Sequence, residues 1–163
     1  MIRSIVLWPD PVLATLCAPV ERIDDEVRQL AADMLETMYA APGRGLAAPQ
    51  VGVALRLFVM DAGWKNGESS PRILINPEIV TESQVRVSGP EGCLSIPGVT
   101  AEVERAESLT MRWTSLDGAM HEEDLSGFEA VCAQHEFDHL NGIVTFDRIA
   151  LETREELEKV YAA

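Results

Sequence analysis

The chain has 163 residues, of which 47% are hydrophobic and 25% are charged, and its formal net charge is −14. This composition is ordinary for a folded globular protein, and we expect residues 1–163 to form a single catalytic domain. The acidic excess argues against binding to nucleic acid or to an anionic membrane by bulk electrostatics.

The cysteine content and the N-terminus predict a cytoplasmic protein. The three cysteines, Cys17, Cys93 and Cys132, are odd in number and widely spaced, so no disulfide framework is expected. The apolar N-terminal run stops at Pro9 and is too short for a signal peptide. No apolar run approaches the ~20 residues that a membrane-spanning helix needs.

In chain order, residues 8–20 are expected to be extended, because three prolines interrupt them. Apolar residues then recur at steps of three and four from Ile23 to Met38, which predicts an amphipathic helix packed on the core. Residues 41–52 contain three glycines and two prolines, which excludes a regular helix. Gln50, a neutral amide among apolar neighbours, fits either a bond to the backbone of a tight turn or a contact with a ligand.

Several short strands and a final helix follow. We predict strands at 55–60, 73–75 (ended by Asn76-Pro77) and 79–88, a loop at 89–98, a strand pair within 99–115, a turn at Asp117-Gly118, and a helix at 152–161. This order predicts an α+β fold. Small antiparallel or mixed sheets would pack around a central helix, with an N-terminal amphipathic helix and a short C-terminal helix.

Residues 127–142 are predicted to form the central helix. Ser126 and Glu129 have the spacing of a capping box, and Asn141-Gly142 supplies a left-handed stop. Between them lies His135-Glu136-Phe137-Asp138-His139, an H-E-x-x-H pattern. Both imidazoles can reach one metal ion from a single helix face, and the glutamate can act as a base on a water molecule. The alternative for this stretch is a helix whose two histidines are ordinary core or surface residues and bind no metal.

The motif leaves the third metal ligand open. Glu152, Glu155 and Glu156 lie downstream, as the third ligand does in many zinc peptidases, but they belong to an acidic helix that is expected to be solvated. Cys93 is the better candidate, because it lies in a loop rich in glycine and proline that could present a thiolate. A small buried thiol is the alternative for this cysteine.

Three separated segments resemble the three motifs of the peptide deformylase family. They are Gly43-Arg-Gly-Leu-Ala-Ala-Pro-Gln50, Glu91-Gly-Cys-Leu-Ser95 and Gln134-His-Glu-Phe-Asp-His-Leu140. Their order and spacing also fit, and the resemblance extends over essentially the whole chain. It implies a metal-dependent hydrolase that removes the N-formyl group from N-formylmethionyl peptides of nascent proteins and releases formate.

The resemblance also implies roles for individual residues. Cys93, His135 and His139 would bind one divalent metal ion, ferrous iron in the cell, with zinc, nickel or cobalt able to replace it. Glu136 would take a proton from the attacking water and pass it to the departing amine. The side-chain amide of Gln50 and the backbone N–H of Leu94 would stabilise the oxyanion.

The resemblance further implies that the peptide lies extended beside the backbone of Gly45 and Gly92. Phe128, Val131 and Cys132 would line the methionine pocket. An ion pair between Arg105 and Glu91 would brace the cysteine loop.

Three features depart from the family pattern. Arg44 occupies a position that usually carries a branched aliphatic residue of the methionine pocket, and Thr100 lies where a basic residue often contacts the peptide. Residues 151–163 contain four glutamates against one arginine and one lysine. Transient contact with the ribosome is known for basic termini in the family, and this acidic terminus makes it unfavourable.

Three other functions stay open at this point. The chain could be a zinc peptidase of the H-E-x-x-H type that uses a downstream glutamate. It could be a paralogue that only binds metal or peptide, or a deacylase that acts on another acyl group. Arg44 is the feature that keeps the non-catalytic paralogue open.

Overall fold

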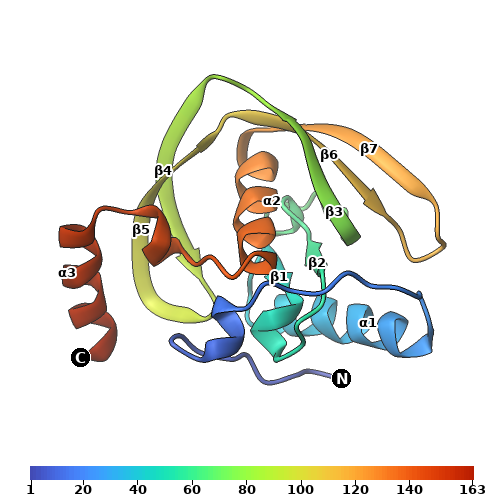
Figure 1. Cartoon of the computed structure of the whole chain (residues 1–163), viewed down its shortest axis with the longest axis horizontal. Helices are drawn as coiled ribbons and strands as arrows, with labels where there is room; N and C mark the ends of the chain where they lie inside the picture. The colour runs from blue at the N-terminus through green and yellow to red at the C-terminus, as the bar shows by residue number, and fades with distance from the viewer.

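The structure is a computed structural model that describes residues 1–163 as an α+β fold with three helices and seven strands (Figure 1). The helices are α1 (Asp25–Ala40), α2 (Gly127–Leu140) and α3 (Leu151–Ala162). The strands are β1 (Gly45–Ala47), β2 (Leu57–Met60), β3 (Arg72–Glu82), β4 (Arg86–Cys93), β5 (Ile96–Ala106), β6 (Ser108–Thr114) and β7 (Met120–Ser126). These observations confirm the predicted class, the amphipathic N-terminal helix and the short C-terminal helix.

Two antiparallel sheets organise the chain. Five strands pair in the order β1-β2-β3-β6-β7, and β4 and β5 form a separate two-stranded hairpin. The helix α2 lies between this hairpin and the larger sheet (Figure 1) and contacts strands of both. None of the three helices combines the length and the apolar character that crossing a bilayer requires.

The first helix, α1, forms for the reasons expected from its sequence. The Asp24 side chain caps it by accepting a hydrogen bond of 3.0 Å from the Val27 N–H. Leu30, Met34 and Met38 are buried on one face and belong to a cluster with residues of β1 and β2. This helix therefore supports the strand β1, which leads into the site.

The ends of α2 agree only partly with the prediction. The helix begins at Gly127 and stops before Gly142, whose φ of 74° lies in the left-handed region. The predicted capping box is wrong, because the Ser126 side chain makes no capping hydrogen bond. Glu129 instead forms an ion pair of 2.7 Å with Arg72 of β3.

The predicted boundaries of two strands are wrong. Asn76-Pro77 does not end a strand, because β3 continues through it with a shift in register between Ile75 and Glu78. Asn76 adopts a φ of 51°, and its side chain exchanges two hydrogen bonds with the backbone of Val20. The strand predicted at 79–88 is also divided, because β3 and β4 enter different sheets.

The predicted loop at 89–98 is instead a hairpin in which Gly89–Cys93 belongs to β4 and Ile96–Gly98 to β5. Glycine and proline are tolerated there because β4 has only one neighbouring strand. The predicted pairing within 99–115 is likewise wrong, since β5 pairs with β4 while β6 pairs with β3 and β7. The predicted turn at Asp117-Gly118 does connect β6 to β7. The hairpin β4–β5 consequently carries its turn to the face of α2 that holds the histidines.

Candidate metal centre

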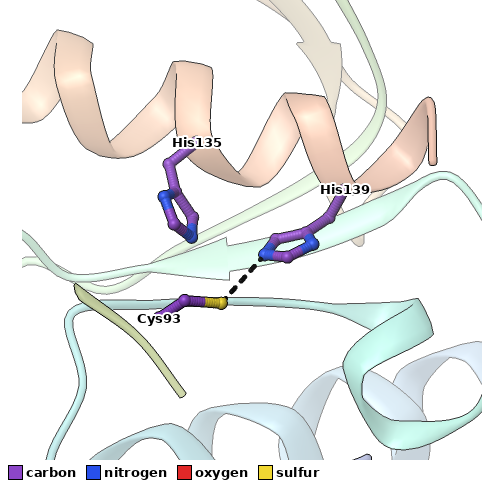
Figure 2. A group of neighbouring side chains, drawn as sticks. All are labelled: Cys93, His135 and His139. Atoms are coloured by element: carbon purple, nitrogen blue, oxygen red, sulfur yellow. Dashed lines mark hydrogen bonds between the residues drawn. The ribbon is translucent and has the colours of Figure 1, made fainter. Parts of the chain in front are cut away.

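The centre is formed by one face of α2 and the end of β4. His135 and His139 lie one helical turn apart, with their ring centroids 5.0 Å from each other. Both histidines are buried, and Figure 2 shows their rings directed from the helix toward Cys93. The Cys93 sulfur lies 3.5 Å from Nε2 of His139. The three residues therefore approach from two separate elements.

Cys93 is placed by an irregularity in the hairpin. The register of β4 against β5 shifts between Gly92 and Cys93, immediately before the turn. Such a bulge redirects a side chain relative to the regular pleat. The thiol is half-buried, and it is not bonded to another cysteine.

These three side chains fit a metal ion. One ligand atom from each residue lies within 4.8 Å of the others. Burial lowers the pKa of His139 well below its usual value, so this imidazole is in the neutral form that binds metals. One thiolate and two imidazoles suit a borderline-soft divalent ion and leave a coordination position for water. Glu152, Glu155 and Glu156 on α3 do not join the group.

A chain of ion pairs begins at the Nδ1 atom of His135. This nitrogen lies 2.9 Å from Glu91, and Arg105 donates two hydrogen bonds of 2.9 and 2.8 Å to the same carboxylate. The predicted Arg105–Glu91 pair is thus present. Arg105 also donates to Asp138 over 2.6 Å, and Arg148 donates to the same carboxylate over 2.6 and 3.0 Å. A carboxylate on the far nitrogen of a histidine fixes the ring that would face the metal.

Charge states within this chain follow from its contacts. Burial alone would raise the pKa of Glu91, but Arg105 and His135 hold it down to about 2. Although burial opposes the change, Glu91 and Asp138 raise the pKa of Arg105 above its usual value. Glu91 and Arg105 therefore both keep their charges at neutral pH.

Glu136 has a different environment. Its side chain is buried, and its Oε1 makes no hydrogen bond. Burial raises its pKa to about 7, against the opposing effect of His135. Gly45 packs directly on this carboxylate, because a Cβ at that position would lie 2.5 Å from Oε2. A carboxylate of this kind can both take up and release a proton near neutral pH.

Gln50 makes the backbone contact that was one of the two alternatives for it, and its free end faces Ser95 and Cys93. Its Oε1 accepts a hydrogen bond of 3.0 Å from the Ala47 N–H, which fixes the orientation of the amide. Its Nε2 donates to Ser95 over 3.0 Å and lies 3.6 Å from the Cys93 sulfur. The neighbouring Leu94 N–H donates to no other backbone group. Two donors therefore lie beside Cys93.

A cleft of about 810 Å³ opens onto these groups. Its lining includes all six residues predicted to contact the substrate, which are Arg44, Gly45, Gly92, Phe128, Val131 and Cys132. The space beside Gly92 is empty of protein atoms, because a Cβ added there would meet nothing within 4 Å. This backbone is therefore open for a ligand to approach.

Ser95, Asp138 and Arg148 belong to the site but were assigned no role from the sequence. Ser95 and Asp138 belong to two of the motifs, so the motifs could have identified them as site residues. Arg148 had no such signal, because it meets Asp138 only through the fold of the chain after α2.

We expect Cys93→Ala to lose the metal. Removing a partner outside the ligand set typically weakens metal binding about 10- to 100-fold, so loss of a direct ligand should exceed this. Metal content after dialysis against a chelator would measure it, with Cys17→Ala as the control, because Cys17 is a buried thiol outside the cluster. Full metal retention in Cys93→Ala would show that Cys93 is not the third ligand.

The α+β fold, the Cys/His/His group and the adjacent buried glutamate define a metallohydrolase type of site. The family model described as polypeptide deformylase matches residues 2–155. A peptide deformylase of Afipia carboxidovorans is 51% identical over 160 residues, which cover 98% of this chain and 94% of that protein. The chain belongs to the polypeptide deformylase family.

Solved structures agree with this assignment. A peptide deformylase from Legionella pneumophila has a TM-score of 0.93 and 38% identity, and the match covers 99% of this chain and 94% of that one. The peptide deformylase from Synechococcus elongatus in complex with actinonin has a TM-score of 0.92 and 40% identity, with coverages of 97% and 86%.

Proposed function

We propose that this chain is a metal-dependent hydrolase that removes the N-formyl group from N-formylmethionyl peptides of nascent proteins and releases formate. The observation that carries the proposal is the Cys93, His135 and His139 cluster, which lies beside a buried glutamate in a chain of the deformylase family. A peptide would enter through the cleft that opens onto this cluster.

Cys93, His135 and His139 hold the metal ion in this proposal. Ferrous iron is the ion we expect in the cell, with zinc, nickel or cobalt able to replace it. When bound, the ion polarises the formyl carbonyl and lowers the pKa of a water molecule. Glu91 keeps the His135 ring turned toward the ion through the 2.9 Å contact with Nδ1.

Glu136 moves the proton. Water adds its oxygen to the formyl carbon, and Glu136 accepts the proton that this water loses. The carboxyl group then delivers the proton to the amine nitrogen as the C–N bond breaks, so the products are formate and a free N-terminus. The pKa of about 7 suits both steps, because proton transfer is most efficient when the pKa lies near the working pH.

Gln50 and Leu94 stabilise the negative charge that develops on the formyl oxygen. The Gln50 amide is already fixed by Ala47, so its Nε2 needs little reorganisation to donate to an oxyanion. The Leu94 N–H, which lacks a backbone acceptor, supplies the second donor.

The peptide lies extended between the backbones of Gly45 and Gly92, and pairs as an added strand. Phe128, Val131 and Cys132 line the pocket for the methionine side chain, which Arg44 borders. The helix with both histidines is the centre around which the two sheets pack, and residues 1–163 form one catalytic domain.

The cellular location of the activity follows from the proposed substrate. Formylated nascent chains are made where translation takes place, so we place the activity in the cytoplasm. We do not expect α3 to dock on the ribosome, because its only arginine, Arg154, is already paired with Asp147 and Glu158.

Formate release from formyl-Met-Ala-Ser tests the proposal. The protein would be purified anaerobically with ferrous iron, and Glu136→Ala would serve as the comparison. We expect release by the wild type and a fall of about 10²- to 10⁴-fold in the variant, which is the usual contribution of a general base. No release by folded, metal-loaded wild type would favour another acyl substrate or a binding role.

Arg44→Ile is expected to raise kcat/KM for neutral formyl-Met peptides several-fold. The Nε of Arg44 is buried without a hydrogen-bond partner, and such a donor is costly beside an apolar side chain. Steady-state kinetics with formyl-Met-Ala-Ser amide would measure the change. An equal or lower kcat/KM would show that Arg44 does not limit the turnover of neutral peptides.

A further inference from the structure

The lining of the cleft carries two basic side chains that form no ion pair with a carboxylate. Eight of the eleven arginines form ion pairs, and neither lysine does. Five cations are therefore unpaired, and two of them, Arg44 and Lys65, line the same cleft. The chain has a net charge of −14, so two unpaired cations in the lining of one cleft create a locally positive region on an acidic protein.

Both cations lie over aromatic rings. The guanidinium carbon of Arg44 is 4.9 Å from the centroid of the Phe128 ring, and the Lys65 ammonium is 5.8 Å from that of Trp64. Contacts of this kind favour a limited set of positions for each cation and leave its hydrogen-bond donors free. Arg44 is half-buried, and its Nε has no hydrogen-bond partner.

The two segments that carry these residues are fixed to each other. Trp64 donates its indole N–H to the Gly43 carbonyl over 2.8 Å, which ties the turn containing Lys65 to the residue before Arg44. The Trp64 ring also packs edge-on against Tyr39 of α1, with centroids 5.2 Å apart. Arg44 and Lys65 are thus held on one wall of the cleft.

No carboxylate near this wall forms an ion pair with Arg44 or Lys65. Glu91 is paired with Arg105, and Glu129 is paired with Arg72. Glu68 lines a hollow next to the cleft that Arg44 also borders, but the two residues form no ion pair. Glu136, at the floor beside the histidines, is the remaining acidic group of the cleft.

We propose that Arg44 and Lys65 make this enzyme selective for formylated peptides with an acidic side chain in the first two positions after the formylated residue. This inference rests on the proposed function and names its substrate class. A carboxylate there would accept hydrogen bonds from the terminal guanidinium nitrogens of Arg44 and gain from the charge of Lys65. The cleft thereby counters the repulsion that the acidic protein otherwise exerts on acidic peptides.

The test compares four formyl-Met tripeptide amides, which lack a terminal carboxylate. Glutamate occupies the second or the third position, and glutamine at the same position is the uncharged match. For wild type we expect kcat/KM to be about fivefold higher for the glutamate member of at least one pair, corresponding to one partly exposed ion pair. This ratio should fall toward one in 1 M salt, where the Debye length is only about 3 Å.

The double variant Arg44→Gln/Lys65→Gln should bring the ratio to one or below. Lys159→Gln/Arg22→Gln removes the same number of unpaired positive charges away from the cleft and should keep the wild-type ratio. Formate release from all four peptides with no glutamate preference, or a preference that survives the double variant, would overturn the inference. Absence of formate from every peptide would instead count against the proposed function.

Discussion

Gly45→Ala is expected to lower kcat/KM by at least about 10²-fold while the protein stays folded. The added Cβ would lie 2.5 Å from Oε2 of Glu136 and 2.9 Å from the Cys132 sulfur. The backbone has little freedom to move away, because β1 is paired with β2 at this residue. The end of the glutamate side chain is free to yield, and a displacement of about 1 Å in a catalytic group can cost about 10²-fold in rate.

Gly89→Ala is the matched control for this substitution. Gly89 lies on β4 outside the cleft, and a Cβ there would meet nothing within 4 Å. Both variants should show the metal content and thermal unfolding of wild type, and only Gly45→Ala should lose formate release. Normal kinetics in Gly45→Ala would mean that the observed position of the Glu136 carboxylate is not required for the reaction.

Local patterns predicted the helices well. The apolar repeat from Ile23 to Met38 and the H-E-x-x-H pattern each depend on residues close in sequence, and both produced helices at the expected places. Strand pairing was predicted poorly, because the register of a strand depends on partners far along the chain. Asn76-Pro77 resembles a strand end, yet a contact between Asn76 and Val20 stabilises a bulge there.

The same distinction holds in the site. The motifs placed Cys93, His135 and His139 in one proposed cluster, and the structure brings them together. The contact of Gln50 with Ser95 joins residues 45 positions apart, and nothing local in the sequence indicated it. Gly45 could be recognised as a glycine that a close approach requires, but only the structure identifies Glu136 as the group that approaches. Lys65 had no motif at all, and its place beside Arg44 depends on the Trp64–Gly43 contact.

Arg105→Met is expected to lower the free energy of unfolding by about 3–5 kcal/mol, the usual effect of breaking a buried ion pair from one side. Arg105 is almost fully buried, and its loss leaves the carboxylates of Glu91 and Asp138 facing a methionine. Because Glu91 also orients His135, metal affinity should fall about 10- to 100-fold. Urea unfolding of the metal-free chain and competition with a chelator would measure the two effects.

Arg112→Met on β6 is the matched control, since this arginine is 43% exposed in its ion pair with Glu122 and should contribute at most about 1 kcal/mol. The pH dependence separates loss of the ion pair from a general packing defect. The folded-state pKa of Glu91 is about 2, below its usual 4.5, so wild type holds this stabilisation above about pH 4.5 and loses it as the pH falls toward 2. In Arg105→Met the pKa of Glu91 should rise, and this acid-dependent loss should shrink. An undiminished acid-dependent loss in Arg105→Met would show that the stabilising charge on Glu91 does not depend on Arg105.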